Sequence, residues 1–565
     1  MRKHVFGVLF VAVCAWGSFG AAANVASAQR PRTMDEVIDR VITNENRMYN
    51  SMKNYSPLVE TYIQDLKPDK ELGYVPAGDK YFLGRADFSK GVSLVSLSDT
   101  DNKGKKIFSS IGNFFSFSMQ FLPDGFLQMI FIDTDGFDKQ HYKFDYVKRE
   151  FLGEVRCLVF DVTPLPKSGK GRFLGRIWVE DQDYNVVRFN GAYEGGGHSS
   201  WYFHFDSWRT NVQPGLWLPS FVYSEERDLH YAMAKKLDFK AQTRLWGYNI
   251  GHASEEQELS KILVESPVND QTTTANDLSP VQAQRSWDRE AEDNVIDRFQ
   301  RIGLIAPKGE VDKILETVVN NLEVTNNLDI EPDVRCRVMT TSTLESFTVG
   351  HTIVLSRGLI DVLPDEPSLA SVLAIELAHI VLGHRLDPNY AFFDQLLVGD
   401  KDTFRHFGFA RTPEEEKQAN DKAAQLLRNS PYKNQLATAS LFMQALDSRQ
   451  KDIPNLISGH LGNRVTEMQE ALGTTPVGAD VKPNPQQIAA LPLGGRVKMN
   501  PWNDQLEMLK SKPVGTIAER EKMPFELTPF MPYLTRFGSE TGKPIAASTA
   551  APNDPKSAET DPPKP

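Results

Sequence analysis

The chain has 565 residues, more than a single hydrophobic core ordinarily serves, so we expect two or three domains. Hydrophobic residues make up 40% of it and charged residues 24%, a balance that excludes a disordered, collagen-like or polytopic membrane chain. The formal net charge of -11 would repel a phosphate backbone, and no stripe of Lys and Arg overrides that repulsion. We therefore expect a globular protein that does not bind nucleic acid.

The first 28 residues have the order of a secretory signal peptide. Residues 1–4 are basic, Val5 to Ala23 is an apolar run, and Ala26-Ser27-Ala28 supplies the small residues of a cleavage site. A membrane anchor is the alternative, but the apolar run is short and contains Gly and Ser. We expect cleavage after Ala28, export to the periplasm or cell envelope, and no transmembrane segment in the mature chain.

Residues 34–265 are predicted to form a β-rich domain. A helical pattern over about 34–55 is followed by short alternating runs separated by Gly, Pro, Asp and Asn. Three runs are rich in β-branched and aromatic residues, as half-buried strands are: 175–179, 184–189 and 201–205. The pattern predicts a largely antiparallel sheet.

The order of these elements resembles the half-barrel of periplasmic lipoprotein carrier proteins. It comprises a leading helix, many strands, and an Ile-Trp-Val strand followed by an Asp-rich turn and a Val-Val-Arg strand. The resemblance implies a concave sheet that binds a lipid, a lipoprotein or an acylated peptide. A β domain with a filled core is the alternative.

The rest of the chain is predicted to hold a linker, a helical domain and two terminal segments. Residues 266–292 begin rich in Pro, Thr, Asn and Gln without apolar periodicity, as in a linker. Residues 293–480 form a mainly helical domain, 481–537 a Pro-punctuated extension, and 538–565 a Pro-, Ala- and Ser-rich tail that we expect to be disordered. The fold class expected for the whole chain is α+β.

The segment that carries the chemistry lies in the helical domain. It comprises an edge strand and turn at 342–360, a helix sequence from Leu369 to His384, and a Glu-rich second helix around Glu416. Together these resemble the M48 family of zinc metallopeptidases. The resemblance implies a zincin-like fold, a zinc cofactor, hydrolysis of peptide bonds in a polypeptide substrate, and a role in protein quality control.

The zinc motif of that family has lost a ligand in this chain. In the family, two His residues four apart on one helix face hold zinc, and the Glu after the first His is the general base. Glu376 matches the base and His379 the second ligand, but Ile375 occupies the first-ligand position and has no lone pair. Glu416 opens the pattern Glu-x-x-Ala and matches the third ligand. Asn420 stands where related proteins use an Asp to orient the first His.

Other histidines are candidates for the missing ligand. His384 lies five residues beyond the second-ligand position, which at 3.6 residues per turn directs it away from the ligand face. His351 on the presumed edge strand and His406 in a loop would need a favourable loop path, and the alternative for each is a surface or capping histidine. His460, in Gly-His-Leu-Gly-Asn-Arg, is similar to the family's later His that stabilises an oxyanion, with a helix start as the alternative.

Three functions therefore remain open for the chain. The first is an M48-family protein whose peptidase activity is impaired or lost because of Ile375, retained as a scaffold or peptide-binding surface. The second is an active zinc endopeptidase with a substitute ligand or a bridging water. The third is a carrier or assembly factor that binds lipid or lipoprotein through its N-terminal domain. Whether the protein is an enzyme is left open by the sequence.

Overall fold

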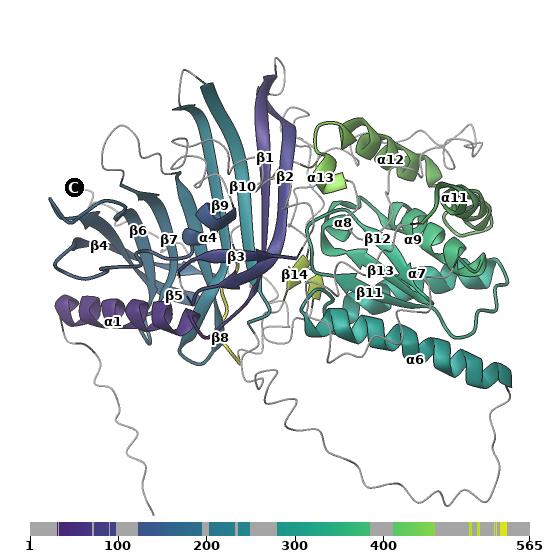
Figure 1. The fold of residues 1–565 in the computed structure, drawn as a ribbon, viewed down its shortest axis with the longest axis horizontal. Coiled ribbons are helices and arrows are strands. Elements are labelled where there is room, and N and C mark those ends of the chain that lie inside the picture. The colour runs from purple at the N-terminus through teal and green to yellow at the C-terminus, as the bar shows by residue number, and fades with distance from the viewer. Residues whose placement is uncertain are drawn as a thin grey trace, which may run out of the picture.

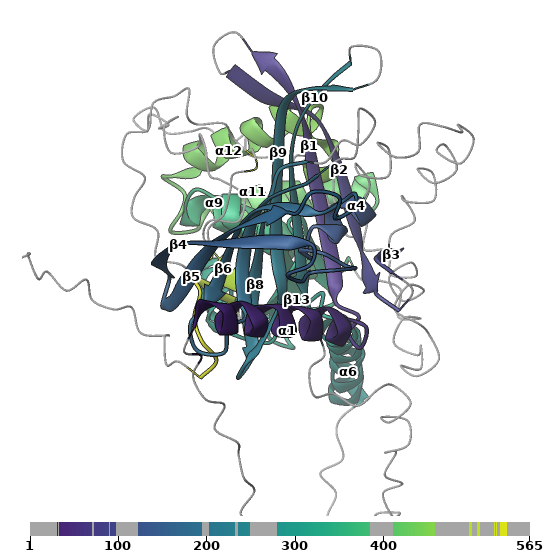
Figure 2. The same cartoon turned by 90° about the vertical axis from the view of Figure 1, so that its left-hand side faces the viewer.

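The computed structural model places a large β-sheet between two helices and a second, mostly helical domain (Figures 1 and 2). Helix α1 (Met34–Met52) lies across one face of the sheet, and α4 (Pro123–Gln128) packs into the same core. The structure describes residues 31, 33–69, 73–89, 91–97, 123–194, 203–231, 235–248, 280–384, 411–457, 497–499, 506–508, 525, 527 and 532–538. No helix among these residues is long and apolar enough to cross a membrane.

The large sheet is antiparallel and follows the strand order β3-β2-β1-β10-β9-β8-β7-β6-β5-β4, so β3 and β4 are its open edges. Its strands are β1 (Leu58–Asp69), β2 (Gly73–Asp87), β3 (Ser93–Ser96), β4 (Tyr142–Leu152), β5 (Val155–Pro164), β6 (Phe173–Glu180), β7 (Val186–Tyr193), β8 (Phe205–Gln213), β9 (Leu216–Tyr231) and β10 (Lys235–Trp246). The antiparallel sheet predicted for this part of the chain is confirmed. Two predicted strands lie in β6 and β7, whereas β8 begins only where the third predicted run ends.

Both faces of this sheet are buried near its centre. On β1, Val59 and Ile63 pack into the core beneath α1, whereas Leu58 and Tyr62 point to the opposite face and join the core of the second domain. This alternation follows from the two-residue period of a strand. We call the face opposite α1 the outer face. The core beneath α1 is rich in aromatic side chains, among them Phe126, Phe160, Phe173, Phe189, Phe205 and Phe239.

Helix α1 is held on the sheet by its buried apolar side chains and by one ion pair. Its start is capped by the Thr33 hydroxyl, which accepts a hydrogen bond from Glu36 N at 3.2 Å. Buried side chains then recur at helical spacing, as Val37 and Val41 illustrate. Glu45 on the same face forms two 2.6 Å hydrogen bonds with the Arg209 guanidinium of β8, and both groups are buried. A helix predicted at this place is confirmed.

The second domain packs helices around a three-stranded sheet. Strand β13 (Thr352–Ser356) pairs parallel with β11 (Arg335–Met339) and antiparallel with β12 (Ser346–Val349), which makes β12 an edge strand. The helices are α6 (Pro280–Arg301), α7 (Glu310–Thr325), α8 (Arg357–Val362), α9 (Glu366–Val381), α11 (Pro413–Arg428), α12 (Leu436–Gln450) and α13 (Pro454–Ile457). Helix α6 begins inside the segment expected to be a linker. The sequence did not predict this start, because the polar sequence of the helix carries little apolar periodicity, although Pro280 suits a first helical turn.

One continuous core joins the two domains. Leu58 and Trp246 of the large sheet belong to the same apolar cluster as the buried residues of the second domain. At the same junction Glu60 of β1 is buried and accepts hydrogen bonds from the backbone N and the hydroxyl of Ser342, at 2.6 and 2.7 Å. It also accepts a hydrogen bond from Arg244 Nη1 at 2.9 Å. The sheet therefore packs against the second domain, beside the segment that leads into β12.

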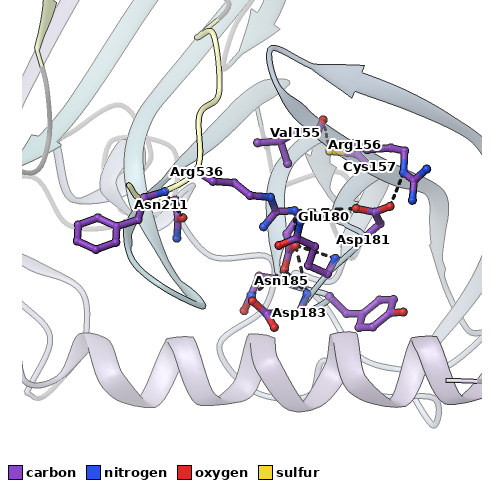
Figure 3. Close-up of polar contacts among 12 residues, drawn as sticks. Val155, Arg156, Cys157, Glu180, Asp181, Asp183, Asn185, Asn211 and Arg536 are labelled. Atoms are coloured by element: carbon purple, nitrogen blue, oxygen red, sulfur yellow. Dashed lines mark hydrogen bonds and ion pairs between the residues drawn. The ribbon is translucent and has the colours of Figure 1, made fainter. Parts of the chain in front are cut away.

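The C-terminal extension contacts both domains. The hairpin β14 (Val497–Met499) and β15 (Leu506–Met508) lies beside α7 and α8. Gln64 of β1 donates a hydrogen bond to Phe525 O at 2.6 Å and accepts one from Leu527 N at 2.7 Å. Residues 532–538 then lie against the outer face of the large sheet (Figure 3). The predicted signal peptide and the tail after residue 538 lie outside the described residues.

Candidate functional site

The candidate site lies where helix α9 faces helix α11 and the edge strand β12. Helix α9 starts at an Asp365 cap, whose side chain accepts a hydrogen bond from Ser368 N at 3.0 Å, and continues through a run of Ala, Leu, Val and Ile. Helix α11 starts at a capping box in which Thr412 and Glu415 bond reciprocally. The two N-terminal caps fix where each helix begins, and therefore which turn of α11 faces the buried side of α9. That turn carries Glu416.

The second and third ligand positions of the predicted zinc motif come together. His379 is fully buried, and its Nε2 atom lies 3.6 Å from Glu416 Oε2. Two ligands of a tetrahedral zinc ion with bonds of about 2.0–2.1 Å would lie about 3.4 Å apart. The pair therefore has nearly the spacing of two zinc ligands.

The first-ligand position is part of the hydrophobic core. Ile375 is 5% exposed and belongs to the apolar cluster that runs through the second domain. Its hydrocarbon side chain cannot donate an electron pair to a metal. Over the part of the chain that the structure describes, no three His, Cys, Asp or Glu side chains are grouped so that they could hold a metal ion. One imidazole and one carboxylate do not fit a catalytic zinc site, which ordinarily uses three protein ligands.

The candidate general base is buried and held by the edge strand. Glu376 is fully buried, and its Oε1 atom accepts a hydrogen bond from the Ser346 hydroxyl of β12 at 2.6 Å, whereas Oε2 has no hydrogen-bond partner among the described residues. Burial raises the pKa of Glu376, and the charge of Glu416 raises it further; His379, the Ser346 hydrogen bond and Arg411 oppose this. The carboxyl group therefore holds its proton more tightly than an exposed glutamate does.

The free energy of unfolding of Glu376→Gln, compared with that of the wild type, should increase as the pH rises from 4 to 7. Because the folded pKa of Glu376 is raised, this group stabilises the fold fully only below its unfolded pKa of about 4.3, and the contribution is lost as the pH rises through the folded pKa. Gln does not titrate and avoids that loss. The measurement is the free energy of unfolding in urea at several pH values.

Glu415→Gln is the matched control, because it should show the opposite trend. Hydrogen bonds from Thr412 N and from the Thr412 side chain lower the pKa of Glu415, so its contribution grows above the unfolded pKa. A stability difference between Glu376→Gln and the wild type that stays constant or falls with rising pH would refute the assigned burial effect.

His384 lies beside His379, a contact that the sequence did not predict, but it is not on the side of the ring that faces Glu416. Helix α9 ends at Val381, and Gly383 adopts a left-handed conformation with φ of +70°. The amide of His384 then bonds back to His379 O at 3.0 Å, and the two imidazoles approach with their Nδ1 atoms 3.0 Å apart. The 3.6-residue period does not apply to His384, because helix α9 has already ended before it. His384 therefore meets the Nδ1 side of His379, while the Nε2 side faces Glu416.

The remaining histidines do not reach this site or lie outside the described residues. His351 lies in the turn between β12 and β13, where its Nδ1 atom is 2.8 Å from Glu292 Oε1 on α6. That contact holds the ring against α6 rather than α9. His406 and His460 fall outside the residues that the structure describes.

Two side chains beside the site are not among the residues expected from the sequence. Ser346 binds Glu376, and Arg411 Nη2 donates a hydrogen bond to Thr348 Oγ1 at 2.7 Å. Burial lowers the pKa of Arg411, whereas the nearby charges of Glu376, Glu415 and Glu416 raise it. The alternation of polar and apolar residues in Ser-Phe-Thr-Val was the available signal, because it places Ser346 and Thr348 on one face of β12.

A comparison with protein-family models assigns this part of the chain. Residues 306–460 match the model described as Peptidase family M48, which spans β11 to β13, α9, α11 and Glu416. No curated protein matches the chain. The family resemblance expected from the zinc-helix sequence is confirmed, and the family as a whole comprises zinc-dependent metallopeptidases. Residues 306–460 of this chain are therefore a domain of peptidase family M48.

Proposed function

We propose that this chain is an exported protein of the cell envelope whose M48 domain has lost zinc-dependent peptidase activity and serves as a polypeptide-binding scaffold. The observation that carries the proposal is the burial of Ile375 in the apolar core at the first-ligand position. A third protein ligand is needed both to hold the metal and to orient the water that attacks a peptide bond. Export rests on the sequence of the first 28 residues.

The geometry around His379 argues against His384 as a substitute ligand. His384, the histidine that contacts it, approaches Nδ1, whereas a metal shared with Glu416 would be bound through Nε2. The two nitrogens lie on different sides of the imidazole ring, so His384 is on the wrong side to complete that site. Its position instead suits a group that orients His379.

A polypeptide is the proposed partner because the site is bordered by an edge strand. Among the described residues, strand β12 pairs with β13 alone, so its other edge is the one proposed to add an extended segment by backbone hydrogen bonds. Ser346 and Thr348 of the same strand are tied to Glu376 and Arg411, which keeps the strand rigid. Binding of this kind does not need zinc.

The large sheet supports a second candidate function. Ten antiparallel strands with a leading helix across one face are compatible with the half-barrel expected from the sequence. Binding of a lipid or an acylated peptide by this domain is compatible with a non-catalytic M48 domain. The first candidate function belongs to the M48 domain, and the second belongs to the large sheet.

The test of the first proposal is cleavage of an unfolded protein substrate. With zinc supplied, the wild-type chain should cleave the substrate no faster than the Glu376→Gln variant, and a chelator should change neither rate. Chelator-sensitive cleavage by the wild type that Glu376→Gln abolishes would show that the domain is an active zinc peptidase.

A further inference from the structure

The C-terminal residues 532–538 lie against the outer face of the large sheet. The segment contacts the β4–β5 turn, the β6–β7 turn and Asn211 of β8, and we call this contact surface the outer groove (Figure 3). Leu534 is 3% exposed and packs with Val155, Cys157 and other apolar side chains of the outer face. The outer groove thus has an apolar cluster that Leu534 completes, and we call the place of Leu534 in it the apolar pocket.

The backbone of the segment is recognised at two points. Leu534 O accepts a hydrogen bond from Glu154 N at 2.9 Å, and Phe537 N donates one to Asn211 Oδ1 at 2.9 Å. Gly153 adopts a φ of +65°, and a Cβ atom there would lie 2.5 Å from Leu534 N and O. A glycine is therefore required both by the turn conformation and by the close approach of the segment.

The third point of recognition is a buried carboxylate that binds Arg536. Arg536 Nη2 lies 2.8 Å from Glu180 Oε2 and 3.9 Å from Asp181 Oδ1. Glu180 is fully buried and also accepts hydrogen bonds from the backbone N atoms of Gln182, Asp183 and Asn185 (Figure 3). Because the β6–β7 turn already holds the Glu180 carboxylate, this acceptor is formed without Arg536 and is ready to receive a guanidinium.

We propose that the outer groove is a recognition site for extended polypeptides with the pattern Leu-x-Arg, and that the chain's own residues 534–536 are its intramolecular occupant. The two side chains that define the pattern are those with dedicated partners, an apolar pocket for Leu534 and Glu180 for Arg536. Because the chain's own segment is tethered, it competes with an external polypeptide for the outer groove at a high effective concentration. An external segment therefore enters only after the C-terminal segment has been released.

Release is tested with the full chain carrying Arg536→Ala. Loss of the guanidinium should speed hydrogen exchange at the amides of Glu154 and Phe537 by about 10- to 100-fold, since a charge-assisted hydrogen bond is lost while the β6–β7 turn stays intact. Arg156→Ala is the matched control. Arg156 pairs with Asp181 at the same turn, and its side chain is 55% exposed, so its removal should leave both exchange rates unchanged.

Recognition is tested with a labelled peptide of the sequence 532–538. The peptide should bind the Arg536→Ala chain and not the wild-type chain, whose groove is occupied, and a peptide with Ala at the arginine position should bind neither. Unchanged exchange rates in Arg536→Ala would overturn the role of Arg536 in holding the segment. Faster exchange without peptide binding would overturn the outer groove as a recognition site.

Discussion

Replacing Ile375 by His should raise the affinity of the M48 domain for zinc by at least about 10- to 100-fold. His379 and Glu416 already have nearly the spacing of two zinc ligands, and position 375 lies one helical turn before His379 on the same face of α9. Loss of a residue that only orients a ligand typically costs about 10- to 100-fold in metal affinity, so restoring a ligand itself should gain no less. Calorimetric titration with zinc measures the change.

Ile375→Leu is the matched control for this substitution. It keeps the volume and the apolar character of a core side chain that is 5% exposed, so it should leave zinc affinity at the wild-type level. The His variant should also gain thermal stability when zinc is added, because a ligand that binds only the folded state stabilises it. An Ile375→His chain that folds but binds zinc no better than Ile375→Leu would show that α9 does not present the ligand face inferred for it.

Replacing Glu60 by Ala should lower the free energy of unfolding by about 3–5 kcal/mol, the cost of removing one partner from a buried ion pair. The substitution leaves the buried Arg244 guanidinium and the amide of Ser342 without this acceptor. Burial and the nearby charge of Arg357 already lower the pKa of Arg244 to about 10, which shows how poorly this position tolerates an uncompensated positive charge. Urea unfolding of the full chain gives the difference.

The control for Glu60→Ala is Asp145→Ala on the edge strand β4. Asp145 pairs with Lys143 at 2.8 Å, and the two side chains are 51% and 63% exposed, so the substitution should cost less than about 1 kcal/mol. Equal effects of the two substitutions would contradict the view that the Glu60 network joins the domains. A large effect of Glu60→Ala alone would establish the large sheet as a structural part of the M48 domain.

The residues predicted most directly from the sequence are those with a local pattern or a family motif. Val37 and Val41 recur at helical spacing and mark α1, and the Ile-Trp-Val run marks β6 because β-branched and aromatic residues suit a pleated, buried surface. Glu376, His379 and Glu416 come from the family motif, and the structure places them around one point between α9 and α11.

The contacts that the sequence did not predict depend on chain reversals or on long separations along the chain. His384 reaches His379 because Gly383 reverses the chain after α9, which a continued helical pattern does not anticipate. Glu60 bonds to Ser342 across 282 positions, and Arg536 to Glu180 across 356. Isolated polar residues carry no periodicity, so their partners follow only from how the elements pack.

The zinc content of the purified wild-type chain tests the central claim most directly. After incubation with an equimolar amount of zinc and removal of unbound metal, elemental analysis should find far less than one zinc ion per chain, because Ile375 adds no ligand to His379 and Glu416. One zinc ion per chain that is lost on replacing His379 by Ala would contradict the account and establish a metal site completed by a further ligand.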